Sequence, residues 1–180
     1  HAMKLDMMNN NTLWYDAIQL ERKQINDYKT FIALEKGERP PTGYQKIPYH
    51  IVFAVKYDGR RKARLVAGGN WTVVDKEESY SGVIGLDSVR LEFFLGELNN
   101  LQCCAGDIGN AYLYSKTREK VYIIAGPEFG DFEGCILIID KALYGLKSSA
   151  ARWAETLTNK LCSLGFTPSK ADPCLFMRDR

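Results

Sequence analysis

Apolar residues recur with a helical period in three stretches of the chain, residues 13–31, 88–98 and 150–164. Each stretch predicts an amphipathic helix with one buried face. Polar residues or glycine that favour helix ends flank them, namely Thr12, Asp87 or Ser88, and Gly165. The buried face expected for the second helix consists of Val89, Phe93, Phe94 and Leu98.

A β-hairpin is expected between the first two helices. Residues 47–56 and 61–67 alternate between apolar and polar side chains, and residues 57–59, Tyr-Asp-Gly, favour a tight turn between them. Because strand side chains alternate, Lys62 and Arg64 should project together from one face of the return strand. Two cations are therefore predicted on one side of the hairpin.

Short apolar runs predict further strands at residues 102–107, 121–124, 135–139 and 173–177. Residues 70–86 have little periodicity and predict an irregular connection. A hairpin with short strands and separate helices indicates an α+β fold. We expect an antiparallel sheet built around residues 102–107 and the strand near Cys174, backed by the last two helices.

The composition is typical of one folded domain. The 180 residues are 46% hydrophobic and 26% charged, and no apolar run approaches the roughly 20 residues that a membrane helix requires. There are five cysteines, and Cys103 and Cys104 are adjacent in an apolar run, which favours reduced thiols inside a cell. With His1 and His50 as the histidines and no Cys-x-x-Cys pair, a zinc site is not expected.

Positive charge is clustered although the total is balanced. The net charge is only +2, so bulk electrostatics do not indicate a nucleic-acid partner. The local cluster comprises Lys56, Arg60, Arg61, Lys62 and Arg64. Such a basic strip is typical of surfaces that follow phosphates, and a solvated, charged hairpin is the alternative.

Asp107 follows an apolar run and precedes Ile108, Gly109 and Asn110. A buried carboxylate without a partner is costly, so its position needs a reason. Asp107 could be a turn-former that accepts hydrogen bonds from the amides of Gly109 and Asn110. It could also be a ligand of a hard cation, because magnesium takes carboxylate and carbonyl oxygens. The residues alone leave both interpretations open.

Three segments together resemble a known family. Residues 107–112, Asp-Ile-Gly-Asn-Ala-Tyr, resemble the reverse transcriptase segment that carries the first catalytic aspartate. Residues 141–147 look like the Leu-Tyr-Gly-Leu-Lys signature of copia-type LTR-retrotransposon polymerases, and residues 62–67 look like their fingers strand. The likeness runs in the family's order from about Trp14 to Met177.

The resemblance implies part of a right-hand polymerase. Residues 13–101 would be fingers-like and residues 102–180 a partial palm, with residues 143–153 as a segment between the two. Residues 1–12 would be an N-terminal arm that begins with His-Ala-Met, which is typical of an expression tag. Trp14, Ala17 and Glu21 resemble the family's opening Trp-x-x-Ala-x-x-x-Glu and are assigned to packing.

The resemblance also implies site residues. Asp107 would be catalytic and, with the backbone carbonyl of Ile108, would bind magnesium or manganese, only weakly in this chain. Lys62 and Arg64 would grip the triphosphate of the incoming nucleotide. The remaining assignments are Ala111 and Tyr112 to the nucleotide, and Lys56, Arg60, Arg61, Lys147 and Arg152 to nucleic acid. Tyr112 would exclude a 2′-hydroxyl by its bulk, the alternative being an aromatic ring packed under a turn.

The family's remaining carboxylates are not in this sequence. The family places a Tyr-any-Asp-Asp hairpin after the strand near Cys174, and this sequence has no Asp-Asp pair. Where the family continues Gln-Ala-Pro-Arg after its signature lysine, this chain has Ser-Ser-Ala-Ala at residues 148–151, and residues 79–83 also depart from the family pattern. We therefore expect that the chain does not synthesise DNA alone.

The expected partners are an RNA template, a DNA primer, deoxynucleoside triphosphates and the remainder of a polyprotein, with no membrane. The expected location is a cytoplasmic particle or the nucleus. The alternatives are a non-catalytic nucleic-acid-binding domain with a polymerase-like fold, and a structural domain of a polyprotein. Salt-dependent binding to an RNA–DNA hybrid separates these two alternatives. The sequence leaves the oligomeric state open.

Overall fold

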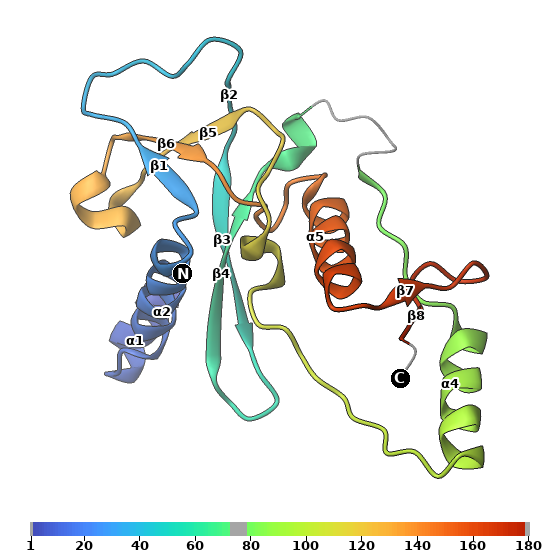
Figure 1. Ribbon diagram of the computed structural model, residues 1–180. Coiled ribbons are helices and arrows are strands. Elements are labelled where there is room, and N and C mark those ends of the chain that lie inside the picture. Colours follow the sequence, from blue (N-terminus) through green and yellow to red (C-terminus); the bar gives the residue numbers. More distant parts are fainter. Residues whose placement is uncertain (1, 73–78, 179–180) are drawn as a thin grey trace.

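The computed structural model describes residues 2–72 and 79–178 (Figure 1). The helices are α1 (Ala2–Asn9), α2 (Leu13–Asp27), α4 (Leu86–Leu98) and α5 (Ser149–Ser163), with short 3-10 helices η1 (Gly69–Trp71), η2 (Ala111–Tyr114) and η3 (Pro127–Phe132). The strands are β1 (Phe31–Ala33), β2 (Gln45–Lys46), β3 (Tyr49–Val55), β4 (Arg61–Ala67), β5 (Val121–Ile124), β6 (Ile136–Ile139), β7 (Thr167–Pro168) and β8 (Phe176–Met177). This mixture confirms the α+β class. The expected connection over residues 70–86 lies partly outside the described residues.

The predicted hairpin is confirmed as β3 and β4. The two strands pair antiparallel, with Val52 opposite Arg64 and Ala54 opposite Lys62. Ala63 and Leu65 are buried, whereas Lys62 and Arg64 are partly exposed, as the alternation of strand side chains requires. Helix α2 packs along β4 and covers its buried side chains.

A second sheet holds the core. Its strand order is β1-β6-β5-β2, with β2 and β5 parallel and the other neighbours antiparallel. Its inward side chains join those of α2, β4 and the loop before α5 in one cluster that includes Ile25, Leu65, Ile123, Ile139 and Leu143. Each such side chain contributes roughly 1.5–3 kcal/mol by its burial. The cluster fixes β4 relative to residues 142–146.

Helix α2 is capped by a side chain from α1, and not by Thr12 as expected. Thr12 occupies the N-cap position, but its hydroxyl donates to the Asp16 side chain. The buried carboxylate of Asp6 accepts hydrogen bonds from the backbone amides of Trp14 and Tyr15, at 3.0 and 2.9 Å. Residues 2–9, expected as an arm, therefore form a helix that caps its neighbour. The predicted helix over residues 13–31 ends at Asp27, and Phe31 begins β1.

Helix α4 forms where predicted but is capped and packed differently. The Asp172 carboxylate accepts hydrogen bonds from the Gly85 amide at 2.8 Å and the Ser88 hydroxyl at 2.6 Å. These hydrogen bonds, the Ser88 one foremost, lower the pKa of Asp172 below its ordinary value. The expected buried face is wrong, because Phe93, Phe94 and Leu98 are each at least 60% exposed.

The central strand expected at residues 102–107 is not formed. These residues are irregular and exposed, Cys103 and Cys104 among them, and cross the molecule as a single segment between α4 and η2 (Figure 1). A strand needs a neighbour that satisfies its amides and carbonyls. No described strand pairs with these residues, because the strand near Cys174 shortens to β8 and pairs with β7. Helix α5 correspondingly packs on η2 and β7 and does not back such a sheet.

Among the described residues, no helix is both long enough and apolar enough to cross a bilayer.

Candidate nucleotide and nucleic-acid site

A polar cleft of about 350 Å³ lies between α2 and the hairpin. Five of the residues predicted to bind metal or phosphates line it, namely Lys56, Arg60, Arg61, Lys62 and Asp107. The cations come from the β3–β4 hairpin and the carboxylate from the irregular segment that follows α4. The fold therefore places Asp107 beside the basic strip, although more than forty residues separate them in sequence.

Two of the arginines are held by their own hairpin or by α2. Arg60 pairs with Asp58 at 2.6 Å, and the amide and side chain of Arg60 lower the pKa of Asp58. Arg61 donates to the Gly59 carbonyl at 2.9 Å, and its guanidinium lies 5.2 Å from the centre of the Trp14 ring. The buried Nε of Arg61 has no hydrogen-bond partner among the described residues. Arg61 therefore faces the cleft region with its side chain already held by the protein.

Glu21 also lines the cleft, although the sequence analysis assigned this residue to packing. Its carboxylate accepts a hydrogen bond from the Leu65 amide at 2.9 Å, on the edge of β4 that faces away from β3. Burial raises the pKa of Glu21, and the Leu65 amide, Lys62 and Arg64 oppose that rise. One sequence feature could have indicated this role: Glu21 is an acid on the same helix face as the buried Trp14, where a carboxylate needs a partner.

Arg64 belongs to a second group with two tyrosines. Its guanidinium carbon lies 4.9 Å from the centre of the Tyr144 ring. The Tyr144 ring lies 5.0 Å from the Tyr112 ring, tilted by 51°. Tyr112 and Ala111 stand in the first turn of η2, and both are half-buried. Tyr112 thus packs against another aromatic residue and keeps an exposed part.

The segment 141–147 lies against the end of β4. The Ala67 amide donates to the Tyr144 carbonyl at 2.7 Å. Gly145 has φ +92°, and a Cβ added there would lie 2.0 Å from the Ala67 carbonyl oxygen. Glycine is therefore required at this position by both its conformation and its contact. This close approach ties the loop to the strand that bears Lys62 and Arg64.

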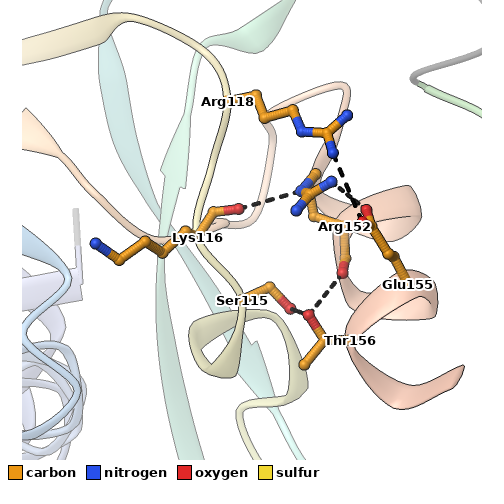
Figure 2. A network of polar contacts seen from close by, with 6 residues as sticks. All are labelled: Ser115, Lys116, Arg118, Arg152, Glu155 and Thr156. Carbon is orange, nitrogen blue, oxygen red and sulfur yellow. Dashed lines mark hydrogen bonds and ion pairs between the residues drawn. The ribbon is translucent and has the colours of Figure 1, made fainter. Parts of the chain in front are cut away.

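Lys147 and Arg152 lie outside the cleft and have protein partners. Lys147 donates to the Thr72 carbonyl at 2.6 Å. Figure 2 shows Arg152 paired with Glu155 and donating to the Lys116 carbonyl at 3.3 Å. Its side chain is only 17% exposed. The structure does not group these two cations with those of the hairpin.

The same region is tied to the segment after η2. The Ser115 hydroxyl donates to Thr156 at 2.8 Å, and Arg118 pairs with Glu155 at 3.6 Å (Figure 2). Thr156 in turn donates to the Arg152 carbonyl at 2.9 Å. These contacts fix α5 against the chain that carries Tyr112.

Asp107 is exposed and provides one carboxylate. No hydrogen bond within the described part of the chain joins it to the amides of Gly109 or Asn110, so the turn-forming alternative gains no support. Residues 2–72 and 79–178 also contain no group of three or more acidic, histidine or cysteine side chains arranged to hold a metal. Magnesium needs several oxygen ligands in near-octahedral geometry. The described residues therefore do not form a complete metal site.

Comparison with known proteins gives the family. The sequence model of the family described as reverse transcriptase (RNA-dependent DNA polymerase) matches residues 30–180. The chain belongs to this family, which confirms the resemblance drawn from its motifs. No solved structure matches it.

Among curated proteins, the chain is similar to the transposon Ty1-DR4 and Ty1-LR2 Gag-Pol polyproteins of Saccharomyces cerevisiae strain S288c and to the transposon TyH3 Gag-Pol polyprotein of Saccharomyces cerevisiae. It is 29% identical to each of them over an alignment of 180 positions that covers 92% of this chain. The match spans only 10–11% of each relative.

Proposed function

We propose that this chain is the fingers and partial palm of an RNA-directed DNA polymerase within a retrotransposon polyprotein. Residues 13–101 then form the fingers-like part and residues 102–180 the palm-like part. The complete protein would transfer a nucleotidyl group from a deoxynucleoside triphosphate to a primer on an RNA template. The observation that carries this proposal is the cleft in which Asp107 lies beside the hairpin cations.

The hairpin supplies the positive charge that the reaction needs. Lys62 and Arg64 would bind the triphosphate, because cationic donors form strong hydrogen bonds with phosphate oxygens. Lys56, Arg60 and Arg61 extend the same strip toward the hairpin turn and would follow the nucleic-acid backbone. Lys147 and Arg152, also predicted to bind nucleic acid, already contact protein groups and would support the site by stabilising the surrounding fold.

The sugar would meet the exposed part of Tyr112, with Ala111 beside it. A ring at this place leaves no room for a 2′-hydroxyl and so favours deoxynucleotides. Its contact with Tyr144 supports this assignment, because a ring that excludes an atom must itself be held in place.

Asp107 and the Ile108 carbonyl would be two ligands of magnesium or manganese in the complete protein. A bound pair of such ions stabilises the attacking and leaving oxygens of an in-line displacement. The other carboxylates would come from a Tyr-any-Asp-Asp hairpin that is not in this sequence. One carboxylate does not hold the ion tightly. We therefore assign no catalytic step to a metal in this chain.

A non-catalytic nucleic-acid-binding domain is the second candidate. The observation in its favour is that the cationic side of the cleft is fully formed, whereas Asp107 stands on an exposed, irregular segment without other acids to form a metal site within the described residues. This candidate would be supported if the chain, and a longer protein that contains it, bound nucleic acid but did not synthesise DNA.

The test is a salt titration of binding to an RNA–DNA hybrid. Replacing Lys62 and Arg64 with alanine should weaken binding and reduce the slope of log K against log salt by about 1–2, since each phosphate contact contributes about one unit. The matched control is Lys36→Ala with Arg39→Ala, which removes the same charges from exposed residues that do not line the cleft. Equal slopes for the two double variants would refute the assignment.

A further inference from the structure

Tyr144 contacts both Arg64, proposed to bind the triphosphate, and Tyr112, proposed to meet the sugar. We propose that Tyr144 is a positioning residue that couples Arg64 to Tyr112 and thereby sets the preference for deoxynucleotides over ribonucleotides. This inference rests on the proposed function. Tyr144 lies in the segment 141–147 and would itself contact neither the phosphates nor the sugar.

The backbone of Tyr144 is fixed to strand β4. Its carbonyl accepts the Ala67 amide at 2.7 Å, on the edge of β4 opposite β3. On either side, Leu143 is 1% exposed and Gly145 packs directly on the Ala67 carbonyl. The backbone of Tyr144 therefore cannot shift unless β4, the strand that carries Lys62 and Arg64, moves with it.

The Arg64 guanidinium lies over the ring of Tyr144. The guanidinium carbon lies 4.9 Å from the ring centre, within the range of a cation–π contact. The attraction is between the positive charge and the ring, and the Arg64 side chain donates no hydrogen bond to Tyr144, so its N–H groups remain for a ligand. Tyr144 thus orients Arg64 without occupying the groups that would bind phosphate.

The same ring supports Tyr112. The two ring centres are 5.0 Å apart, a normal spacing for an aromatic pair. Tyr112 is the second residue of the short 3-10 helix η2, which begins after Asn110 with its φ of +54°. Such a short turn has few internal hydrogen bonds to fix a side chain. Contact with Tyr144 therefore determines how far the Tyr112 ring can move away from a sugar.

Removal of the Tyr144 ring should have a specific effect. Tyr112 would gain space on the side opposite the sugar, and the steric rejection of a 2′-hydroxyl would relax. Arg64 would lose its support at the same time, so binding of both nucleotide types would weaken. A tyrosine that served only the core would change both affinities in the same proportion.

The experiment measures affinities of the 180-residue chain for deoxyguanosine triphosphate and guanosine triphosphate, by displacement of a fluorescent nucleotide in the presence of magnesium. We expect the parent chain to favour the deoxynucleotide. Tyr144→Leu should reduce this preference by roughly tenfold, the scale on which one packing contact discriminates between ligands. Tyr144→Phe keeps the ring and should retain the preference within about twofold, on the same scale.

Two controls separate positioning from stability. Val121→Ala creates a cavity in β5 and destabilises the fold without touching Tyr112, so it should leave the preference unchanged. If Tyr144→Leu does not fold, Tyr144→Met replaces it, because methionine fills similar space without an aromatic face.

The outcomes distinguish the two proposals. A parent chain that binds neither nucleotide would overturn the proposed nucleotide site, and the role of Tyr144 with it. A parent chain that binds and discriminates, while Tyr144→Leu discriminates equally well, would overturn only the role of Tyr144.

Discussion

Gly145→Ala tests the close approach of segment 141–147 to β4. Gly145 has φ +92°, and an alanine Cβ would lie 2.0 Å from the Ala67 carbonyl oxygen and 2.7 Å from Cγ1 of Val66. The nearest atom belongs to the backbone and cannot rotate away. The loop must therefore separate from the strand, and the hydrogen bond between the Ala67 amide and the Tyr144 carbonyl is lost.

The cost has two parts. A side chain at positive φ costs about 1–2 kcal/mol. A buried amide left without its acceptor costs a further 1–3 kcal/mol or so. Together they should lower the free energy of unfolding by about 2–5 kcal/mol, a large fraction of the roughly 5–15 kcal/mol of a typical domain.

Urea denaturation followed by tryptophan fluorescence measures this change. With a slope of about 2 kcal/mol per molar urea, the midpoint should fall by roughly 1–2.5 M. Gly37→Ala is the matched control, since Gly37 has φ +94° and nothing within 4 Å of an added Cβ. It should cost only the first part, about 1–2 kcal/mol. Equal losses in the two variants would refute the steric argument.

Three other substitutions probe single contacts. Asp6→Ala should lower the free energy of unfolding in urea by about 1.5–3 kcal/mol, because the first amides of α2 lose a charged acceptor. Burial raises the pKa of Glu21 above 4.5, so the free energy of unfolding of the parent chain should fall as pH rises through the raised pKa. In a plot of melting temperature against pH, Glu21→Gln should not show this decrease. The pKa of Asp172 is lowered, so its stabilisation is present at neutral pH and lost as pH falls through that lowered pKa. Asp172→Asn should reduce hydrogen-exchange protection of α4 at pH 7 and have a smaller effect in acid, and equal effects at both pH values would contradict this.

The sequence predicted those elements whose cause is local. The hairpin follows from alternation and a short turn, and β4 begins and ends at the predicted residues. Helices α2, α4 and α5 follow from apolar periodicity. The family likeness then pointed to Lys62, Arg64 and Asp107. The fold brings Lys62 and Asp107 to one cleft and places Arg64 against Tyr144.

The errors have non-local causes. Residues 102–107 have the apolar character of a strand, but strand formation depends on a neighbour that local pattern does not reveal. The carboxylates that cap α2 and α4, Asp6 and Asp172, come from other parts of the chain. The contact of Tyr144 with Arg64 and Tyr112 likewise depends on three distant segments, so no spacing rule could have found it.

Primer extension on an RNA template tests the central claim most directly. The proteins to compare are the 180-residue chain and a longer product of the same reading frame, prolonged by roughly 40 residues to admit one more strand-turn-strand unit. The control for Asp107→Asn is Asp131→Asn, which changes an exposed acid outside the cleft. With magnesium or manganese, the longer protein should extend the primer, and the 180-residue chain should not. The longer protein should lose this activity on Asp107→Asn and retain it on Asp131→Asn. Extension by the 180-residue chain itself, or a longer protein indifferent to Asp107→Asn, would contradict the account.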